Sequence, residues 1–291
     1  MAVRIGTGVV VAVLAMGLSN PGWAEATGAA QEGNQGAGHG EAAVTSDGTG
    51  GFCQGFGPQT PRDIGNFAGL NTASFALAPS PAAMNLCNIH THTNAEHKGP
   101  GFSIPAGGSK AGGYLCNETR DLTIEEQIDP LAGHGSYEGI HPGDTIEVHW
   151  VFTSCDITPG QGLGACVSES CANPTLRVES QVFLVVNDDE ALNFHDFDYS
   201  GHQENGLHQP LSLPTGTGAP IVFRGSTTGP SYSEATCSPY QVTWSVRPSC
   251  AKLSYSSINS WAANGNIFNE SHSHGVRELV TAPELLAPIN F

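Results

Sequence analysis

The sequence predicts a mainly β protein, a single domain built around a large, mostly antiparallel sheet with few short helices. Three observations favour this fold class. Segments rich in β-branched and aromatic residues recur along the chain, each bounded by Gly, Pro, Asn, Asp or Ser. The 37 glycines and 19 prolines are spread throughout, as expected for a chain with many turns. Segments with the apolar period of an amphipathic helix are scarce.

The clearest strand candidate is segment 176–186, which begins with alternating apolar and polar residues and ends as an apolar run. That pattern is typical of a strand entering a buried sheet. Two stretches, 122–127 and 282–286, fit short helical turns. The predicted strands, in chain order, are 86–93, 144–153, 176–186, 220–224, 241–246 and 252–255.

The first 24 residues are typical of a secretory signal. Arg4 provides a positive start, an apolar run extends from Val9 to Leu18, and small residues ending at Ala24 suit cleavage there. The apolar run is short for a membrane span, and an uncleaved anchor is the alternative. We therefore expect an exported protein, periplasmic or extracellular, without membrane attachment once residues 1–24 are removed.

Residues 25–50 are rich in Gly, Ala, Gln, Glu and Thr, a composition that predicts a flexible lead-in because it buries little apolar surface. The remaining residues, 51–291, fit one large domain better than two, since all-β domains often reach this size. No internal repeat stands out, which argues against a repeat fold.

The formal net charge is −17, and the chain has only three lysines. Phosphate binding needs clustered Lys and Arg, so this charge disfavours nucleic acid and anionic membranes as partners. Adaptation for solubility is the simpler explanation of the charge. Nothing in the pattern indicates an oligomeric state.

All eight cysteines follow the predicted signal. An even number in an exported chain favours disulfides over metal binding by thiolates, and no Cys-x-x-Cys pair occurs. Eight cysteines allow 105 connectivities. Proximity along the chain favours Cys166–Cys171 and Cys237–Cys250.

Two segments point to a metal site: Cys-Asn-Ile-His90-Thr-His92 and Ile-Glu147-Val-His149-Trp. Residues two apart in a strand share a face, so His90 and His92 project together, and a neighbouring strand would bring His149 to the same point. Three neutral imidazoles with one open position form a catalytic rather than a structural zinc site. Glu147 has the same-face spacing needed to accept the outer N–H of His149. His97 is the main substitute for one ligand.

Two other histidine motifs offer rival sites. His272-Ser-His274 could bind a metal, but it lies among Asn, Ser and Gly without a Glu-x-His segment of its own. His195 next to Asp196 suggests a carboxylate–imidazole pair, yet the chain lacks the Gly-x-Ser-x-Gly of a hydrolase nucleophile. It also lacks the His-Glu-x-x-His helix of metalloproteases.

A turn-rich loop, Gly225-Ser226-Thr227-Thr228-Gly229-Pro230, gains interest beside a zinc site. A threonine hydroxyl there can donate to a buried carboxylate and accept from a zinc-bound hydroxide, which would orient the hydroxide. Glu96, four residues beyond His92, is the candidate carboxylate; otherwise it is an ordinary surface residue.

Taken in order, these motifs resemble carbonic anhydrases. His-Thr-His, Ala-Glu-His, Glu-Val-His-Trp and the Thr-Thr loop resemble the alpha class, whereas His-Thr-His-Thr-Asn-Ala-Glu-His, Glu-Val-His-Trp-Val-Phe-Thr-Ser-Cys-Asp and the cysteine-rich frame most resemble the delta class. The delta-like resemblance extends from about Cys53 to the C-terminus. It implies an alpha-carbonic-anhydrase-like fold for the catalytic domain and reversible hydration of CO2 to bicarbonate through a zinc-bound hydroxide.

By this resemblance, Zn2+ is held by His90, His92 and His149, with Glu147 as the outer partner of His149. The resemblance also implies that Thr227 binds the zinc hydroxide and donates its own hydrogen bond to Glu96. Thr228 would line the side of the site where bicarbonate lies. Thr227 directly follows Ser226, and Gly229 separates the Thr pair from Pro230, which departs from the alpha pattern; Thr228 could therefore exchange roles with Thr227.

A histidine suits the transfer of the released proton, because its ordinary pKa is near 6.5. The candidates are His97, His134, His141, His195, His202, His208, His272 and His274. Two other functions remain open from the sequence: a non-catalytic exported β module that binds metal or faces carbohydrate, and a zinc hydrolase that acts on esters.

Overall fold

A computed structural model describes residues 44–45, 51–107, 112–227, 234–238 and 240–290. The predicted signal, nearly all of the predicted lead-in, and Thr228 lie outside these residues. The described residues all fall within one structural unit, Gln35–Phe291. The predicted domain boundary at residue 51 stays a prediction.

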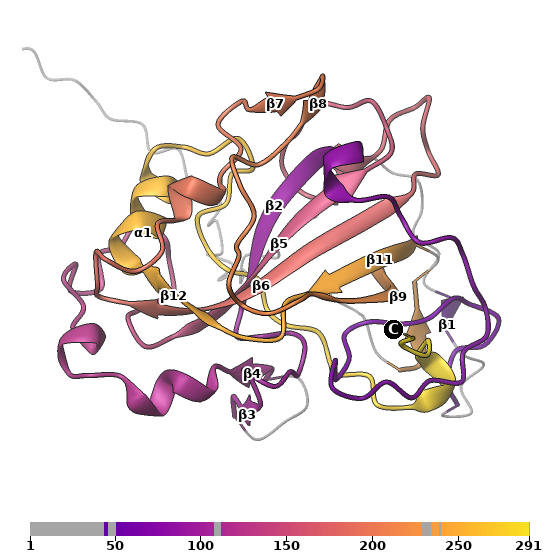
Figure 1. Cartoon of the computed structure of the whole chain (residues 1–291), viewed down its shortest axis with the longest axis horizontal. Coiled ribbons are helices and arrows are strands. Elements are labelled where there is room, and N and C mark those ends of the chain that lie inside the picture. The colour runs from indigo at the N-terminus through magenta and orange to yellow at the C-terminus, as the bar shows by residue number, and fades with distance from the viewer. Residues whose placement is uncertain (1–43, 46–50, 108–111, 228–233, 239, 291) are drawn as a thin grey trace, which may run out of the picture. The chain divides into compact units, whose positions relative to one another are not determined.

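The main element is a six-stranded mixed sheet in the described part of the chain (Figure 1). Its order is β2-β5-β6-β11-β9, and β12 also pairs with β6. Three pairings are antiparallel, whereas β11 and β12 run parallel to successive parts of β6. The strands are β2 (Asn85–Thr93), β5 (Thr145–Thr153), β6 (Leu176–Val186), β9 (Ile221–Thr227), β11 (Tyr240–Val246) and β12 (Ala251–Ser254).

Every strand of this sheet was predicted from the sequence, so the mainly β class is confirmed. The largest boundary error is in β9, which extends three residues beyond the predicted end. The prediction also missed the helix α1 (Tyr255–Ala263), because segment 252–255 has strand composition up to the residue where the helix begins. The two predicted helical turns are matched by short 3-10 helices, η3 (Glu125–Gln127) and η6 (Pro283–Leu285).

The smaller elements lie in the loops around the sheet. Three two-stranded ribbons and four more 3-10 helices are described. The ribbons are β1 (Val44–Thr45) with β10 (Thr236–Cys237), β3 (Ile104–Pro105) with β4 (Tyr114–Leu115), and β7 (Gln203–Glu204) with β8 (Leu207–His208). The 3-10 helices are η1 (Pro81–Ala83), η2 (Asn117–Asp121), η4 (Leu163–Cys166) and η5 (Phe194–Phe197). Within the described chain, no helix has the length and apolar character that a membrane crossing requires.

Both faces of the sheet are covered by apolar side chains. On β5, Val148 and Trp150 belong to one buried cluster, which also includes Trp261 of α1. Val151 belongs to a second cluster, together with Trp244 of β11. Because β5 is buried along its whole length, any polar side chain placed on this strand must find partners inside the protein.

A β-bulge in β2 changes which face its side chains occupy. Leu86 pairs with Phe152, and the register then shifts by one residue before Asn88 pairs with Val151. Leu86 therefore faces the Trp150 cluster, whereas the even-numbered residues after the bulge face the opposite side of the sheet.

The eight cysteines form four disulfides: Cys53–Cys237, Cys87–Cys166, Cys116–Cys250 and Cys155–Cys171. The predicted pairs Cys166–Cys171 and Cys237–Cys250 are both wrong. Proximity in sequence did not predict the pairs, because the tertiary structure determines which cysteines lie close together. The Gly160 N–H donates to the Cys87 carbonyl at 3.0 Å, which brings the following segment, with Cys166, against β2.

Loop length predicts unequal contributions from these disulfides. Replacing Cys116 and Cys250 by Ser opens a link across 134 residues, whereas replacing Cys155 and Cys171 opens one across 16. The chain-entropy relation gives losses of about 5 and about 3 kcal/mol in the free energy of unfolding. Urea unfolding of both variants beside the parent measures the difference; a larger loss for the Cys155–Cys171 pair would contradict the expectation.

Candidate metal centre

The pairing of β2 with β5 places the predicted ligands on one face of the sheet. His90 lies opposite His149, and His92 lies opposite Glu147. On the other side of β5, Ser180 of β6 lies opposite His149. The same-face arrangement predicted from the spacing of these residues is therefore present in the structure.

The three imidazoles form a compact cluster. Their ring centroids are 4.7 to 5.2 Å apart, and one ligand nitrogen from each lies within 4.8 Å of the others. The Nδ1 atom of His149 is 3.2 Å from the Nε2 atom of His90. Two nitrogens bound to one tetrahedral zinc at 2.0–2.1 Å are separated by about 3.3 Å. The donor set thus fits a zinc ion.

Each imidazole donates its other N–H to a fixed acceptor. His90 Nδ1 donates to Asn88 Oδ1 at 2.7 Å, His92 Nδ1 to the Gly275 carbonyl at 3.2 Å, and His149 Nε2 to Glu147 Oε1 at 3.0 Å. These bonds leave His90 Nε2, His92 Nε2 and His149 Nδ1 with lone pairs for a metal. Sequence reasoning found only the Glu147 partner. Asn88 had a signal, since it lies two residues before His90 on the same face, but a backbone carbonyl such as that of Gly275 has none.

Glu147 is fully buried and makes five hydrogen bonds. Its Oε1 accepts from His149, from His97 Nδ1 at 2.7 Å and from Ser180 Oγ at 2.5 Å. Its Oε2 accepts the backbone N–H groups of Glu96 at 2.6 Å and His97 at 3.2 Å. Burial by itself would raise the pKa of this carboxyl, but the imidazoles of His97 and His149 hold the pKa well below its ordinary range. Glu147 is therefore an anion.

The environment also keeps the imidazoles of His90 and His92 neutral. Burial, followed by the neighbouring imidazoles, lowers the pKa of His90 well below its usual value. For His92, burial lowers the pKa to about 4, although nearby Glu96 acts in the opposite direction. A neutral imidazole is the form that binds a metal.

The structure gives Glu96 a different partner from the one predicted. Its carboxylate accepts from Arg277, with Nε to Oε1 at 2.8 Å and Nη2 to Oε2 at 2.6 Å. Thr227 instead lies at the end of β9, opposite Tyr240 and four residues beyond Phe223. Since Phe223 is the β9 residue in ring contact with His97, Thr227 is about 13 Å farther along the strand. The predicted Thr227–Glu96 hydrogen bond is therefore replaced by the Arg277–Glu96 ion pair.

A second group, Glu96, His97 and His149, also has ligand atoms within 4.8 Å of one another. Its histidines already use His97 Nδ1 and His149 Nε2 to donate to Glu147. A metal bound through those nitrogens would displace both bonds. The set His90, His92 and His149 requires no such loss, so it is the better metal centre.

The second His-x-His motif lies beside the cluster and is not a separate centre. His274 pairs with the edge of β2, accepting from the Thr93 N–H at 2.7 Å and donating its own N–H to the Thr91 carbonyl at 2.8 Å. Its ring centroid is 6.1 Å from those of both His90 and His92. His272 is in ring contact with His274. His272 and His274 are thus proton-transfer candidates that are partly exposed and lie beside the proposed ligands. His97, another candidate, is fully buried.

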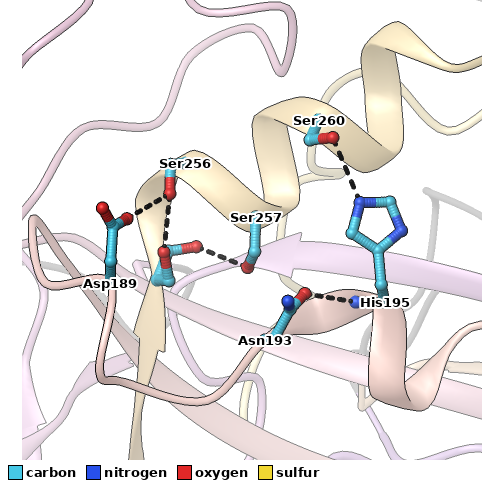
Figure 2. Close-up of a pocket in the computed structure, with 7 residues that line it drawn as sticks. Asp189, Asn193, His195, Ser256, Ser257 and Ser260 are labelled. Carbon is cyan, nitrogen blue, oxygen red and sulfur yellow. Dashed lines mark hydrogen bonds between the residues drawn. The ribbon is translucent and has the colours of Figure 1, made fainter.

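A surface pocket beside α1 contains none of the cluster imidazoles (Figure 2). There, Ser256 donates to the Asp189 carboxylate at 2.6 Å, and His195 Nε2 lies 3.2 Å from Ser260 Oγ. The ring of His195 has this serine as its partner, not the neighbouring Asp196 considered from the sequence. Side chains of this pocket hydrogen-bond to one another, and none of them belongs to a candidate metal-binding group among the described residues.

Comparison with known proteins agrees with the chemistry of the cluster. The model of the family described as Delta carbonic anhydrase matches residues 81–257, well over half of the chain. A search of curated proteins found no match. Among solved structures, the alpha-carbonic anhydrase of Thermovibrio ammonificans, in complex with the inhibitor sulfanilamide, is similar at 16% identity. That alignment covers 76% of this chain and 84% of the other, with a TM-score of 0.23, too low for an argument about fold.

The outer partner of His149 provides a direct test of this geometry. Replacing Glu147 with Gln should weaken zinc affinity by about 10- to 100-fold, the loss typical when an outer hydrogen-bond acceptor is removed. Competition with a chromophoric chelator measures the affinity.

Glu179→Gln is the matched control, because Glu179 is also a buried carboxylate of the sheet but pairs with Arg177 and Arg247. Equal zinc affinities for the Glu147 and Glu179 variants would remove Glu147 from the metal centre.

Proposed function

Since the chain belongs to the delta carbonic anhydrase family, we propose that it hydrates CO2 reversibly to bicarbonate and a proton at a zinc ion held by His90, His92 and His149. The observation that supports this most is the set of outward hydrogen bonds, which leaves one unprotonated nitrogen on each imidazole for the metal. Three protein ligands leave a fourth position open, as catalytic zinc sites require.

The residues of the chain prepare the site for the ion. Asn88, the Gly275 carbonyl and Glu147 each hold a proton on the outer nitrogen of one imidazole, so none of the three rings has to be reoriented when the ion binds. When bound, zinc supplies a nucleophile near neutral pH, because it lowers the pKa of coordinated water from 15.7 to about 7.

The four disulfides indicate an oxidising compartment. We propose export through the signal at residues 1–24, to the periplasm or the medium. CO2 and bicarbonate are the partners that the family implies; the strongly acidic composition argues against nucleic acid.

Stopped-flow CO2 hydration with a pH indicator tests the function. Zinc-loaded, disulfide-intact protein should accelerate the reaction, and His149→Ala should reduce the rate by more than about 100-fold, since losing a ligand exceeds the loss of an outer partner. Glu118→Ala is the control, because Glu118 is exposed on η2 and has no role in the site. A folded, zinc-bound protein that does not hydrate CO2 would favour a metal-binding β module, or a zinc hydrolase if it cleaved an ester.

Export predicts a defined mature N-terminus. If the signal is cleaved after Ala24, N-terminal sequencing of protein from the periplasm or medium should begin at Glu25. Intact Met1 on the exported protein would favour the uncleaved anchor instead.

A further inference from the structure

Glu96 is a buried carboxylate beside the proposed centre. Its Oε1 lies 3.6 Å from His92 Nδ1, the outer nitrogen of that proposed ligand. One of its oxygens is also within 4.8 Å of ligand nitrogens of His97 and His149. Carboxylate oxygens also bind zinc, at about 2.0–2.2 Å. If this side chain turned past the His92 ring towards the ion, it would compete for the open coordination position.

Arg277 holds the Glu96 carboxylate in another direction. Besides the two guanidinium bonds, the backbone N–H of Arg277 donates to Glu96 Oε1 at 3.2 Å. The side chains of both residues are at least nine-tenths buried. A bidentate pair between a planar guanidinium and a carboxylate sets orientation as well as charge, which a single-point contact does not.

The surroundings fix the guanidinium in turn. Its central carbon lies 5.8 Å from the centre of the Trp244 ring, which is itself 5.1 Å from the ring of His149. The backbone of Glu96 is also held, because its N–H donates to the Glu147 carboxylate. Residue 96 is thus tied to Glu147 through its backbone and to Arg277 through its side chain.

We propose that Arg277 is a positioning residue that keeps the Glu96 carboxylate out of the metal's coordination sphere, so that the ion has three imidazole ligands and one open position. The inference rests on the metal centre proposed above. Without the Arg277 side chain, Glu96 would be a buried anion with no counter-charge of its own, and a dication held by the neighbouring imidazoles would supply the missing positive charge.

Cobalt-substituted full-length protein tests the inference without relying on turnover. The visible spectrum of Co2+ reports the ligand number, and titration with thiocyanate reports whether the fourth position is accessible. In Arg277→Gln we expect an altered spectrum before any anion is added, and a thiocyanate affinity lower by about 10-fold or more, taking the loss typical of an outer partner as the minimum.

Two further variants separate positioning from a direct effect of Arg277 on the anion. Glu96→Gln combined with Arg277→Gln should restore the parent spectrum and affinity, because an amide is a poor zinc ligand. Arg277→Lys should give an intermediate affinity, because an ammonium makes only a point contact. Arg120→Gln, at an exposed arginine of η2, is the control for loss of positive charge.

An unchanged spectrum and affinity in Arg277→Gln, with one Co2+ bound, would overturn the inference but leave the metal centre intact. Failure of the double variant to recover would also overturn it. If Arg277→Gln does not fold, Arg277→Lys carries the test, and parent-like behaviour would again refute the inference. A parent protein that binds no Co2+ would overturn both the centre and the inference.

Discussion

The site depends on one buried anion, the Glu147 carboxylate in the middle of the sheet. It accepts from His149 and Ser180 on its own and the neighbouring strand, and from His97 and the backbone of residues 96–97 in the segment after β2. A charge buried between two apolar layers is tolerated only when it is this fully hydrogen-bonded. The hydrogen bonds to Glu147 connect β5 with β6 and with the segment after β2, and one of them orients His149, a proposed ligand of the metal.

Two carboxylates lie close to the imidazoles, but only one of them accepts a hydrogen bond from a proposed ligand. Glu147 holds the outer nitrogen of His149, whereas Glu96 is held away by Arg277. The segment that ends in Arg277 also supplies the Gly275 carbonyl and places His274 beside β2. A stretch almost two hundred residues beyond β2 therefore completes the edge of the sheet and supplies partners for the groups on it.

The sequence was sufficient for the parts of this protein that follow from local pattern. Alternation and β-branched content identified every strand of the main sheet, and the two-residue spacing of His90, His92, Glu147 and His149 predicted their common face. Partners brought by tertiary contacts were not predictable. Arg277 lies in no motif, and its pairing with Glu96, 181 residues away, depends on how the C-terminal segment returns to the sheet. The disulfide partners failed for the same reason. The break between β12 and α1 was missed because Tyr255 suits both a strand and a helix that packs on the sheet.

The bulge at Cys87 divides β2 into two halves that follow opposite alternation rules. Before it, even-numbered positions point into the layer that contains Trp150; after it, the same parity points towards Glu147. The histidines occupy their side of the sheet only because one extra residue precedes them. Deleting a single residue at the bulge would keep every ligand in the sequence and yet direct His90 and His92 into an apolar layer. For this strand, chain length between fixed points is as strict a requirement as residue identity, and indels within it should be rarer among functional homologues than substitutions.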